Sequence, residues 1–491
     1  MKKYLIILLL FHIFLGVSPC SATDMTAQYY INSGGAKFAK GNYIGSINDL
    51  TNAILKDPRN MHAYACRGEA KGRLNDYNGA IADFSLAIMI KPDFARLYYD
   101  RALLKSKIED NSGALSDYSK AIDLDPKFSD AYCNRGNIKL KMNDYMGAIN
   151  DSTKALELNP SDQIAYNNRG YAYSSLHKYK EAIADLDKAI ELGSNDAEIF
   201  YKRGECNAVS KNYKKAFSDF TKTLELNPND IFAYKNRGRI EFEFKDYKNA
   251  IADFTKAIEL NPNDLDSYSY RAYCKFQLKD AKGAVEDITK IIELDSNNAN
   301  AYYNRGTAYA NLLDFKNAIN DLSKYIALNP NNADAYYNRG ISKYEMGDYK
   351  SAIEDHKKSI NLGFKSVYSY VNIGNCKNKL GDYSGAIEYF NYAIKLNSKY
   401  TNAYIDRGFS NRMLKNYKNA LSDFSKAIEV DPKSASAYYN RGLCRLSCGD
   451  KIGYEADIKQ AKKLLLINNS SKDLKTPYEA KNLQVLSNYL F

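Results

Sequence analysis

The sequence predicts an all-α fold of stacked helical hairpins, and two observations predict it. A small residue, Gly or Ala, recurs every 34 residues from Gly34 to Gly442, through thirteen units without an insertion or deletion. Within each unit, apolar residues follow the period of about 3.6 residues of a helix in two stretches, with turn-forming residues between them. Each unit is therefore expected to be a helix, a tight turn and a second helix, in one continuous array over residues 27–466.

Small and aromatic residues keep the same phase in every unit, whose positions we number from 1 to 34 starting at Ala27. Position 8 is Gly or Ala, and position 20 is Ala in eleven units, which allows two helices to approach closely. Position 4 is Tyr in twelve units and Phe200 in the other, and this ring is expected to fill the adjoining space. Eight of the ten prolines stand at position 32, where we expect them to begin the next unit's first helix.

Two charged positions vary together. Position 7 is Arg in eleven units and position 23 is Asp in twelve. Unit eleven has Ile373 and Tyr389 there, so both charges are lost at once. The joint loss predicts that each Arg contacts the Asp of its own hairpin in a bidentate guanidinium–carboxylate pair that fixes hairpin register. The alternative is two separate, solvated surface charges.

The 34-residue pattern resembles the tetratricopeptide repeat. The resemblance covers residues 27–466 and implies a right-handed superhelical solenoid, in which the first helix of each unit lines a concave groove through positions 2, 5, 6, 9, 12 and 13. It also implies a protein-binding scaffold but does not indicate the ligand, because this family mediates many unrelated interactions.

Asparagine at position 6 is the first candidate for ligand binding. An amide offers both a donor and an acceptor, so a row of amides can pair with the main chain of an extended peptide. The alternative is that these asparagines only complete a stable hairpin. The predicted groove residues of this row, which also includes Asn32, are Asn134, Asn168, Asn236, Asn304, Asn338, Asn372 and Asn440.

Apolar side chains in the same groove are the second candidate, because exposed apolar patches usually mark contacts. The alternative is that these side chains pack against neighbouring units. The predicted patch spans units ten to twelve and consists of Tyr337, Ile341, Tyr344, Val371, Ile405 and Phe409.

The residue inventory gives no indication of an enzyme. The histidines lie far apart in the array, so no metal site is expected, and no nucleophile–base set, phosphate loop or dinucleotide fingerprint is present. We therefore predict no cofactor. The net charge of +11 is spread along the chain without a basic block, so no nucleic-acid partner is expected.

The two ends differ from the repeats. Lys2 and Lys3 precede an apolar run and the small-residue site Cys20-Ser21-Ala22, which predicts a signal peptide over residues 1–22 and no membrane span after its cleavage. Lipid attachment at Cys20 is the less favoured alternative, since Pro19 precedes it. Residues 467–491 are expected to form a connector and a C-terminal capping helix.

Together these features predict a non-catalytic scaffold of the bacterial cell envelope, in the periplasm or at the cell surface. It would bind an extended peptide or a partner protein in its concave groove. Two alternatives are a structural, self-associating envelope component and an accessory subunit of a secretion or polysaccharide machine.

Overall fold

The computed structural model describes residues 26–470, which form 26 α-helices joined by turns, with no strand in this range. The helices pair into thirteen hairpins in the predicted phase, so the all-α helix-turn-helix repeat fold is confirmed. The predicted signal peptide and most of the predicted C-terminal segment, including its capping helix, lie outside the described residues.

In each hairpin the first helix covers positions 1–13, and the second helix begins at position 17. The first helices are α1 (Ala27–Ala39), α3 (Met61–Arg73), α5 (Ala95–Lys107), α7 (Ser129–Lys141), α9 (Gln163–Ser175), α11 (Ala197–Val209), α13 (Ile231–Glu243), α15 (Leu265–Gln277), α17 (Ala299–Asn311), α19 (Ala333–Glu345), α21 (Val367–Lys379), α23 (Thr401–Met413) and α25 (Ala435–Ser447). The second helices are α2 (Tyr43–Lys56), α4 (Tyr77–Ile90), α6 (Asn111–Leu124), α8 (Tyr145–Leu158), α10 (Tyr179–Glu191), α12 (Tyr213–Leu226), α14 (Tyr247–Leu260), α16 (Ala281–Leu294), α18 (Phe315–Leu328), α20 (Tyr349–Asn361), α22 (Tyr383–Leu396), α24 (Tyr417–Val430) and α26 (Lys451–Ser470).

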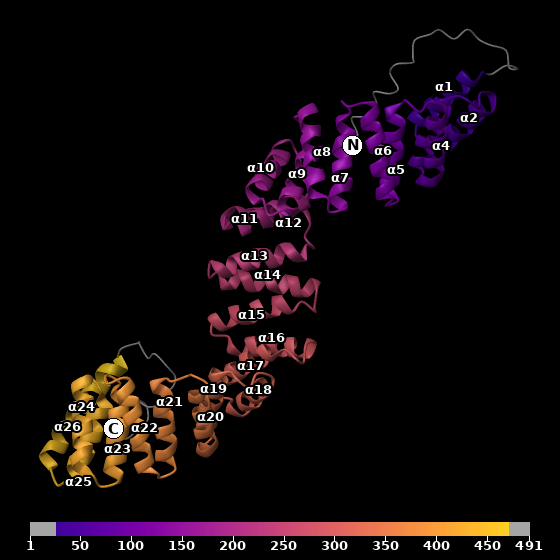
Figure 1. Cartoon of the computed structure of the whole chain (residues 1–491). Helices are drawn as coiled ribbons and strands as arrows, with labels where there is room; N and C mark the ends of the chain where they lie inside the picture. The colour runs from indigo at the N-terminus through magenta and orange to yellow at the C-terminus, as the bar shows by residue number, and fades with distance from the viewer. Residues whose placement is uncertain (1–25, 471–491) are drawn as a thin grey trace. The chain divides into compact units, whose positions relative to one another are not determined.

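The chain divides into two compact units, one ending at Ile240 and the other starting at Glu241. Within each of the two compact units successive hairpins lie side by side (Figure 1). The second helix of one hairpin packs on the first helix of the next hairpin. Within a hairpin, the small residue at position 8 lets the two helices pack closely. A Cβ on Gly374 would lie 2.5 Å from Phe390 Cε1, so a larger residue there would push the two helices of the hairpin apart.

The turn inside each hairpin has a fixed conformation. Position 15 has a positive φ in every hairpin, with Gly at four of these positions and residues such as Asn75 (φ 63°) at the others. The next residue is usually Asp or Asn and begins the second helix, as where Asp76 Oδ1 accepts a hydrogen bond of 2.9 Å from Gly79 N. Turn and cap together set where each second helix starts.

Two expectations about helix ends are wrong. Proline at position 32 does not begin a helix, because Pro58 is the second residue of a turn closed by Asn60 N donating to Asp57 O at 3.2 Å. Its fixed φ suits that turn position. At the other end α26 extends to Ser470, so residues 468–470 are helical where a polar connector was expected.

Two connections between hairpins differ from the others. The second helices α10 and α20 have 13 residues, and each is followed by a Leu-Gly pair in which the glycine, Gly193 or Gly363, has a φ of 100° or 107°. Both glycines stand at position 31, and every other positive φ in residues 26–470 is at position 15. The fifth and tenth hairpins therefore end in a second type of connection.

Candidate functional site

The predicted pair between positions 7 and 23 is present. Arg339 donates from Nε and Nη2 to the two carboxylate oxygens of Asp355, at 2.8 and 2.6 Å, and Asp355 is buried. The ring at position 4 covers the guanidinium, as where Arg339 Cζ lies 5.5 Å from the centroid of Tyr336. The Arg residues with this Asp contact are Arg67, Arg101, Arg135, Arg169, Arg203, Arg271, Arg305, Arg339, Arg407 and Arg441.

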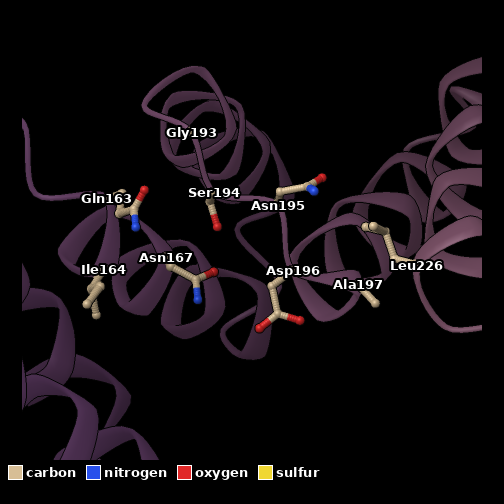
Figure 2. Close-up of a pocket in the computed structure, with 9 residues that line it drawn as sticks. All are labelled: Gln163, Ile164, Asn167, Gly193, Ser194, Asn195, Asp196, Ala197 and Leu226. Atoms are coloured by element: carbon tan, nitrogen blue, oxygen red, sulfur yellow. The ribbon is translucent and has the colours of Figure 1, made fainter. Parts of the chain in front are cut away.

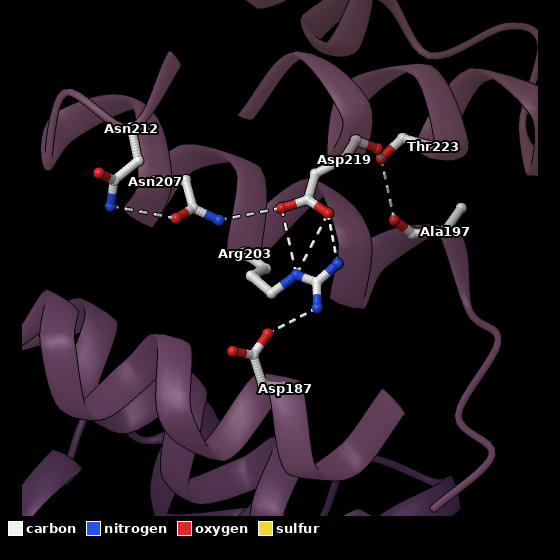
Figure 3. Close-up of polar contacts among 7 residues, drawn as sticks. All are labelled: Asp187, Ala197, Arg203, Asn207, Asn212, Asp219 and Thr223. Atoms are coloured by element: carbon white, nitrogen blue, oxygen red, sulfur yellow. Dashed lines mark hydrogen bonds and ion pairs between the residues drawn. The ribbon is translucent and has the colours of Figure 1, made fainter. Parts of the chain in front are cut away.

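Each of these arginines also links its hairpin to the preceding one, which the sequence reasoning missed. Arg339 Nη1 donates to Ser323 Oγ at 3.0 Å, and Ser323 stands at position 25 of the hairpin before it. Figure 3 shows the same arrangement at Arg203, which lies between Asp219 of its own hairpin and Asp187 of the preceding one. One guanidinium therefore fixes both the register of a hairpin and its attachment to its neighbour.

The eleventh hairpin lacks this whole arrangement. Ile373 is buried where the Arg would be, and the preceding hairpin has Lys357 at position 25 in place of a hydroxyl. Lys377 Nζ, which would otherwise face an Asp, lies 5.8 Å from the ring centroid of Tyr389 and pairs with Asp382. Inside this hairpin a buried Ile373 and a cation–π contact thus replace the Arg–Asp pair, and the link of Arg to position 25 of the preceding hairpin is absent.

The asparagines at position 6 make a second kind of contact between hairpins. In several of them Nδ2 donates to a tyrosine hydroxyl at position 5 of the preceding hairpin, and the side chain of Asn372 is hydrogen bonded to Tyr337 at that position. The other pairs are Asn134 with Tyr99 (2.9 Å), Asn236 with Tyr201 (3.2 Å) and Asn338 with Tyr303 (3.1 Å). These amides therefore help to stack the hairpins. One Nδ2 hydrogen is used, while Oδ1 of Asn134 and Asn338 accepts no hydrogen bond from the described residues.

The remaining asparagines of the row differ from one another. Asn304 is exposed, Asn440 donates to Ser436 O of its own helix at 2.8 Å, and Asn168 is buried and donates to Cys133 O at 3.2 Å. Binding of a peptide main chain by this row stays a prediction.

The predicted apolar patch is partly core. Val371 and Ile405 are buried at 5% and 7% exposure inside the packing of their hairpins, so they are not part of an accessible surface. The other members are half-buried: Ile341, Tyr337, which lies 4.9 Å from Phe364, Tyr344, which lies 5.4 Å from Tyr349, and Phe409, which lies 6.4 Å from Tyr383.

Two titratable groups beside this patch have shifted pKa values. Burial raises the pKa of Asp406 to about 7, although a hydrogen bond with Asn375 acts in the opposite direction. Burial lowers the pKa of His356 to about 4, and neither of its ring nitrogens has a hydrogen-bond partner among the described residues. His356 fills a slot that is Phe in other hairpins, so it acts as an aromatic core residue.

Potential metal ligands do not gather in the described part of the chain. No cluster of His, Cys, Asp and Glu suitable for a metal ion lies within residues 26–470. The cysteines there are free, and Cys448 is exposed whereas Cys133, Cys206, Cys376 and others are buried. None of the helices described combines the length and the apolar character needed to span a bilayer.

Known protein families match the chain in the same repeats that the hairpins form. The tetratricopeptide repeat family matches residues 129–162, 164–196, 231–264, 299–332 and 367–400, and related families described as TPR repeat and tetratricopeptide repeat match 107–143 and 322–354. Four of the matches begin at position 1 of a hairpin, which confirms the phase. The chain is a tetratricopeptide-repeat protein. Proteins of this repeat family are scaffolds that typically bind other proteins or peptides.

Solved structures of tetratricopeptide-repeat proteins resemble parts of the chain. YrrB, described as a TPR protein with an unusual peptide-binding site, is 26% identical, covers 38% of this chain and 95% of its own, and has a TM-score of 0.36. MamA is 28% identical, with 34% and 92% coverage and a TM-score of 0.33. The C-terminal part of a TPR repeat-containing protein from Cytophaga hutchinsonii is 24% identical, with 48% and 97% coverage and a TM-score of 0.41. None of the curated proteins matches the chain.

Proposed function

We propose that this tetratricopeptide-repeat chain is a non-catalytic scaffold of the bacterial cell envelope, exported through residues 1–22 to the periplasm or the cell surface. It binds an extended peptide or a partner protein on the surface formed by positions 2, 5, 6, 9, 12 and 13, which we call the first-helix face.

The proposal depends on the unused hydrogen-bonding groups of the asparagine amides at position 6. Asn304 is exposed, and Oδ1 of Asn338 accepts no hydrogen bond from the described residues although its Nδ2 is engaged with Tyr303. A free carbonyl oxygen can accept a hydrogen bond from the main-chain N–H of a peptide, whatever the peptide's side chains. Half-buried rings on the same face, such as Tyr337 and Phe409, would add apolar contact area.

Peptide selection tests the binding surface. Random dodecapeptides displayed on phage are selected on the whole protein, and the affinity of enriched peptides is measured by fluorescence anisotropy. Asn304→Ala should weaken binding by about two- to tenfold, the effect of one lost hydrogen bond. Lys324→Ala, an exposed change on the second helix of the same hairpin, should leave the affinity unchanged. Enriched peptides that bind both variants like the native chain would contradict the proposed face.

Export is tested separately. The full chain with a C-terminal tag is expressed in a bacterium, the envelope fraction is isolated and the N-terminus is sequenced. A chain beginning at Thr23 is expected. Recovery of the uncleaved chain from the cytoplasm would contradict the envelope assignment while leaving the binding proposal intact.

A further inference from the structure

A pocket lies at the connection between the fifth and sixth hairpins, where Gly193 changes the path of the chain. Its volume is about 590 Å³, within the range of small-molecule sites, about 300–1,000 Å³. Figure 2 shows Gln163 and Asn167 of α9 on one side, and on the other the connecting residues Ser194 to Asp196 with Ala197, the first residue of α11. The lining residues are Gln163, Ile164, Asn167, Gly193, Ser194, Asn195, Asp196, Ala197 and Leu226.

The backbone around Gly193 explains why the space is open. Gly193 N donates to Ile190 O at 2.9 Å and Ser194 N donates to Ala189 O at 3.0 Å, which ends α10 one residue early. The chain then runs extended to Asp196, whose Oδ1 accepts a hydrogen bond of 3.2 Å from Glu198 N and caps α11. The connection therefore lacks the proline-containing turn that closes most other joints.

The tenth hairpin provides an internal comparison, because it ends in the same backbone. Phe364 N donates to Ser359 O at 3.1 Å beside Gly363, as Ser194 N does beside Gly193. There, however, position 5 is Tyr337 and position 32 is Phe364, and their rings lie 4.9 Å apart. The fifth hairpin has Asn167 and Ser194 at the same two positions, so two polar side chains stand where two packed rings stand in its counterpart.

The polar side chains around the pocket are the amides of Gln163, Asn167 and Asn195, the hydroxyl of Ser194 and the carboxylate of Asp196, and none of them carries a positive charge. Asn167 shares a hydrogen bond with Tyr171, while its buried Oδ1 has no hydrogen-bond partner among the described residues. A buried acceptor without a donor is costly, so a ligand that supplies an N–H group would satisfy it once the Asn167 side chain turns toward the pocket.

The charges nearby are negative. Asp196, Glu198 and Glu205 all contribute, after burial, to raising the pKa of Tyr171 above its usual range. Lys202 neutralises Glu205 at 2.8 Å, whereas Asp196 and Glu198 form no ion pair with the described residues. The pocket thus contains one carboxylate without an ion pair to the described residues, Asp196, beside polar side chains, with the apolar residues Ile164 and Leu226 at its two ends (Figure 2).

We propose that this pocket receives the side chain of a lysine carried by a partner protein, with the ammonium group facing Asp196 and Asn167 and the alkyl stem against one of the apolar ends, Ile164 or Leu226. An alkylammonium carries three N–H donors and a positive charge, and a positive charge is what this lining lacks. That the ligand is part of a protein rests on the proposed scaffold function.

Saturation-transfer NMR on the whole protein tests the proposal with three probes: Nα-acetyl-lysine methylamide, Nα-acetyl-norleucine methylamide and putrescine. The lysine derivative should give the strongest signal, because norleucine lacks the charge and putrescine lacks the peptide groups. An equal signal from the norleucine derivative would overturn the proposed charge recognition. A stronger signal from putrescine would also overturn it, since a free polyamine would then be the ligand.

Two variants test the pocket itself, whose Ile164 and Asn167 stand at positions 2 and 5 of the first-helix face, four hairpins before Asn304. Asn167→Tyr with Ser194→Phe copies the filled joint of the tenth hairpin and should abolish the lysine signal. Asp196→Asn keeps a residue suited to capping α11 and should weaken lysine binding about two- to fivefold, the effect of one exposed ion pair. If either variant keeps native lysine binding, the pocket assignment is wrong. If peptide binding then still depends on Asn304, the proposed scaffold function stands although the pocket is not a lysine site.

Discussion

Arg339 and Asp355 meet across the tenth hairpin in two parallel hydrogen bonds of 2.8 and 2.6 Å, and Lys343 reaches the same carboxylate at 2.8 Å. Because the carboxylate is buried, its partners matter more than those of a surface ion pair. Arg339→Ile should lower the free energy of unfolding by about 3 kcal/mol, at the low end for a broken buried pair because Lys343 remains.

The double variant Arg339→Ile with Asp355→Tyr reproduces the residues of the eleventh hairpin and should cost less than Arg339→Ile alone, since no carboxylate that has lost two of its three partners stays buried. Both are measured by urea unfolding of the full chain. Equal losses would mean that the pair is not coupled.

The link between hairpins can be tested through the hydroxyl at position 25. Ser323→Ala removes the acceptor of Arg339 Nη1 and should destabilise the chain by about 1 kcal/mol, the usual net value of one hydrogen bond. Ser447→Ala removes an exposed hydroxyl that bonds only its own helix, and it should have a much smaller effect. A similar small effect of both changes in thermal unfolding would argue against the link.

The buried histidine should make stability depend on pH. His356 has a pKa of about 4 in the folded chain against 6.5 for an ordinary histidine, so folding favours its neutral form. Its contribution is fully present above about pH 6.5 and is lost as the pH falls toward 4, by about 3 kcal/mol in total. His356→Phe, the residue found at this slot in other hairpins, should flatten the fall of the melting temperature between pH 6.5 and 4. An unchanged profile would contradict this assignment.

Asp406 should act with the opposite sign. Its folded pKa of about 7 exceeds the ordinary value of 3.8, so folding favours its protonated form, and its stabilising effect is lost as the pH rises from about 4 through 7. Asp406→Asn should therefore raise the melting temperature at pH 8 and change it little at pH 4. Glu429→Gln, an exposed change on α24, is the control. A greater stabilisation at pH 4 than at pH 8 would refute the shift.

Thiol reactivity should separate the cysteines into two groups. Cys448 is exposed, whereas burial raises the pKa of Cys376 to about 12 and that of Cys274 to about 11. Because the thiolate is the reactive form, iodoacetamide at pH 8 should modify Cys448 first in the native chain. Mass spectrometry of peptides after brief exposure gives the order. Modification of Cys376 as fast as that of Cys448 would contradict the packing described for α21.

Repetition made most of the fold predictable. Thirteen aligned units show which positions are small, aromatic or charged, and the joint replacement at Ile373 and Tyr389 identified the pair without any structure. Contacts between units were harder, because each residue was compared only within its own unit. The sequence did contain a signal for these contacts. Wherever position 5 of one unit is Tyr and another unit follows, position 6 of that following unit is Asn, as in Tyr303 and Asn338.

The pocket at Gly193 could not be foreseen in this way. A missing proline shows that a turn differs, but not whether the space beside it is filled. That depends on two side chains far apart in the sequence, Asn167 and Ser194. Similarly, Val371 and Ile405 share helical positions with accessible residues, and only the packing of their neighbours decides that they are buried.

The absence of an arginine at Ile373 has a mechanical consequence. At other joints of the compact unit that starts at Glu241, an Arg guanidinium hydrogen-bonds to the preceding hairpin, as Arg305 Nη1 does to Thr289 Oγ1 at 3.1 Å. Between α20 and α21 the residues at these two positions are Lys357 and Ile373, which cannot form this hydrogen bond with each other. If a load were applied along the array of this unit, we expect separation to begin at that joint. Tension would then first uncover Tyr337, whose contact with Asn372 crosses the same joint.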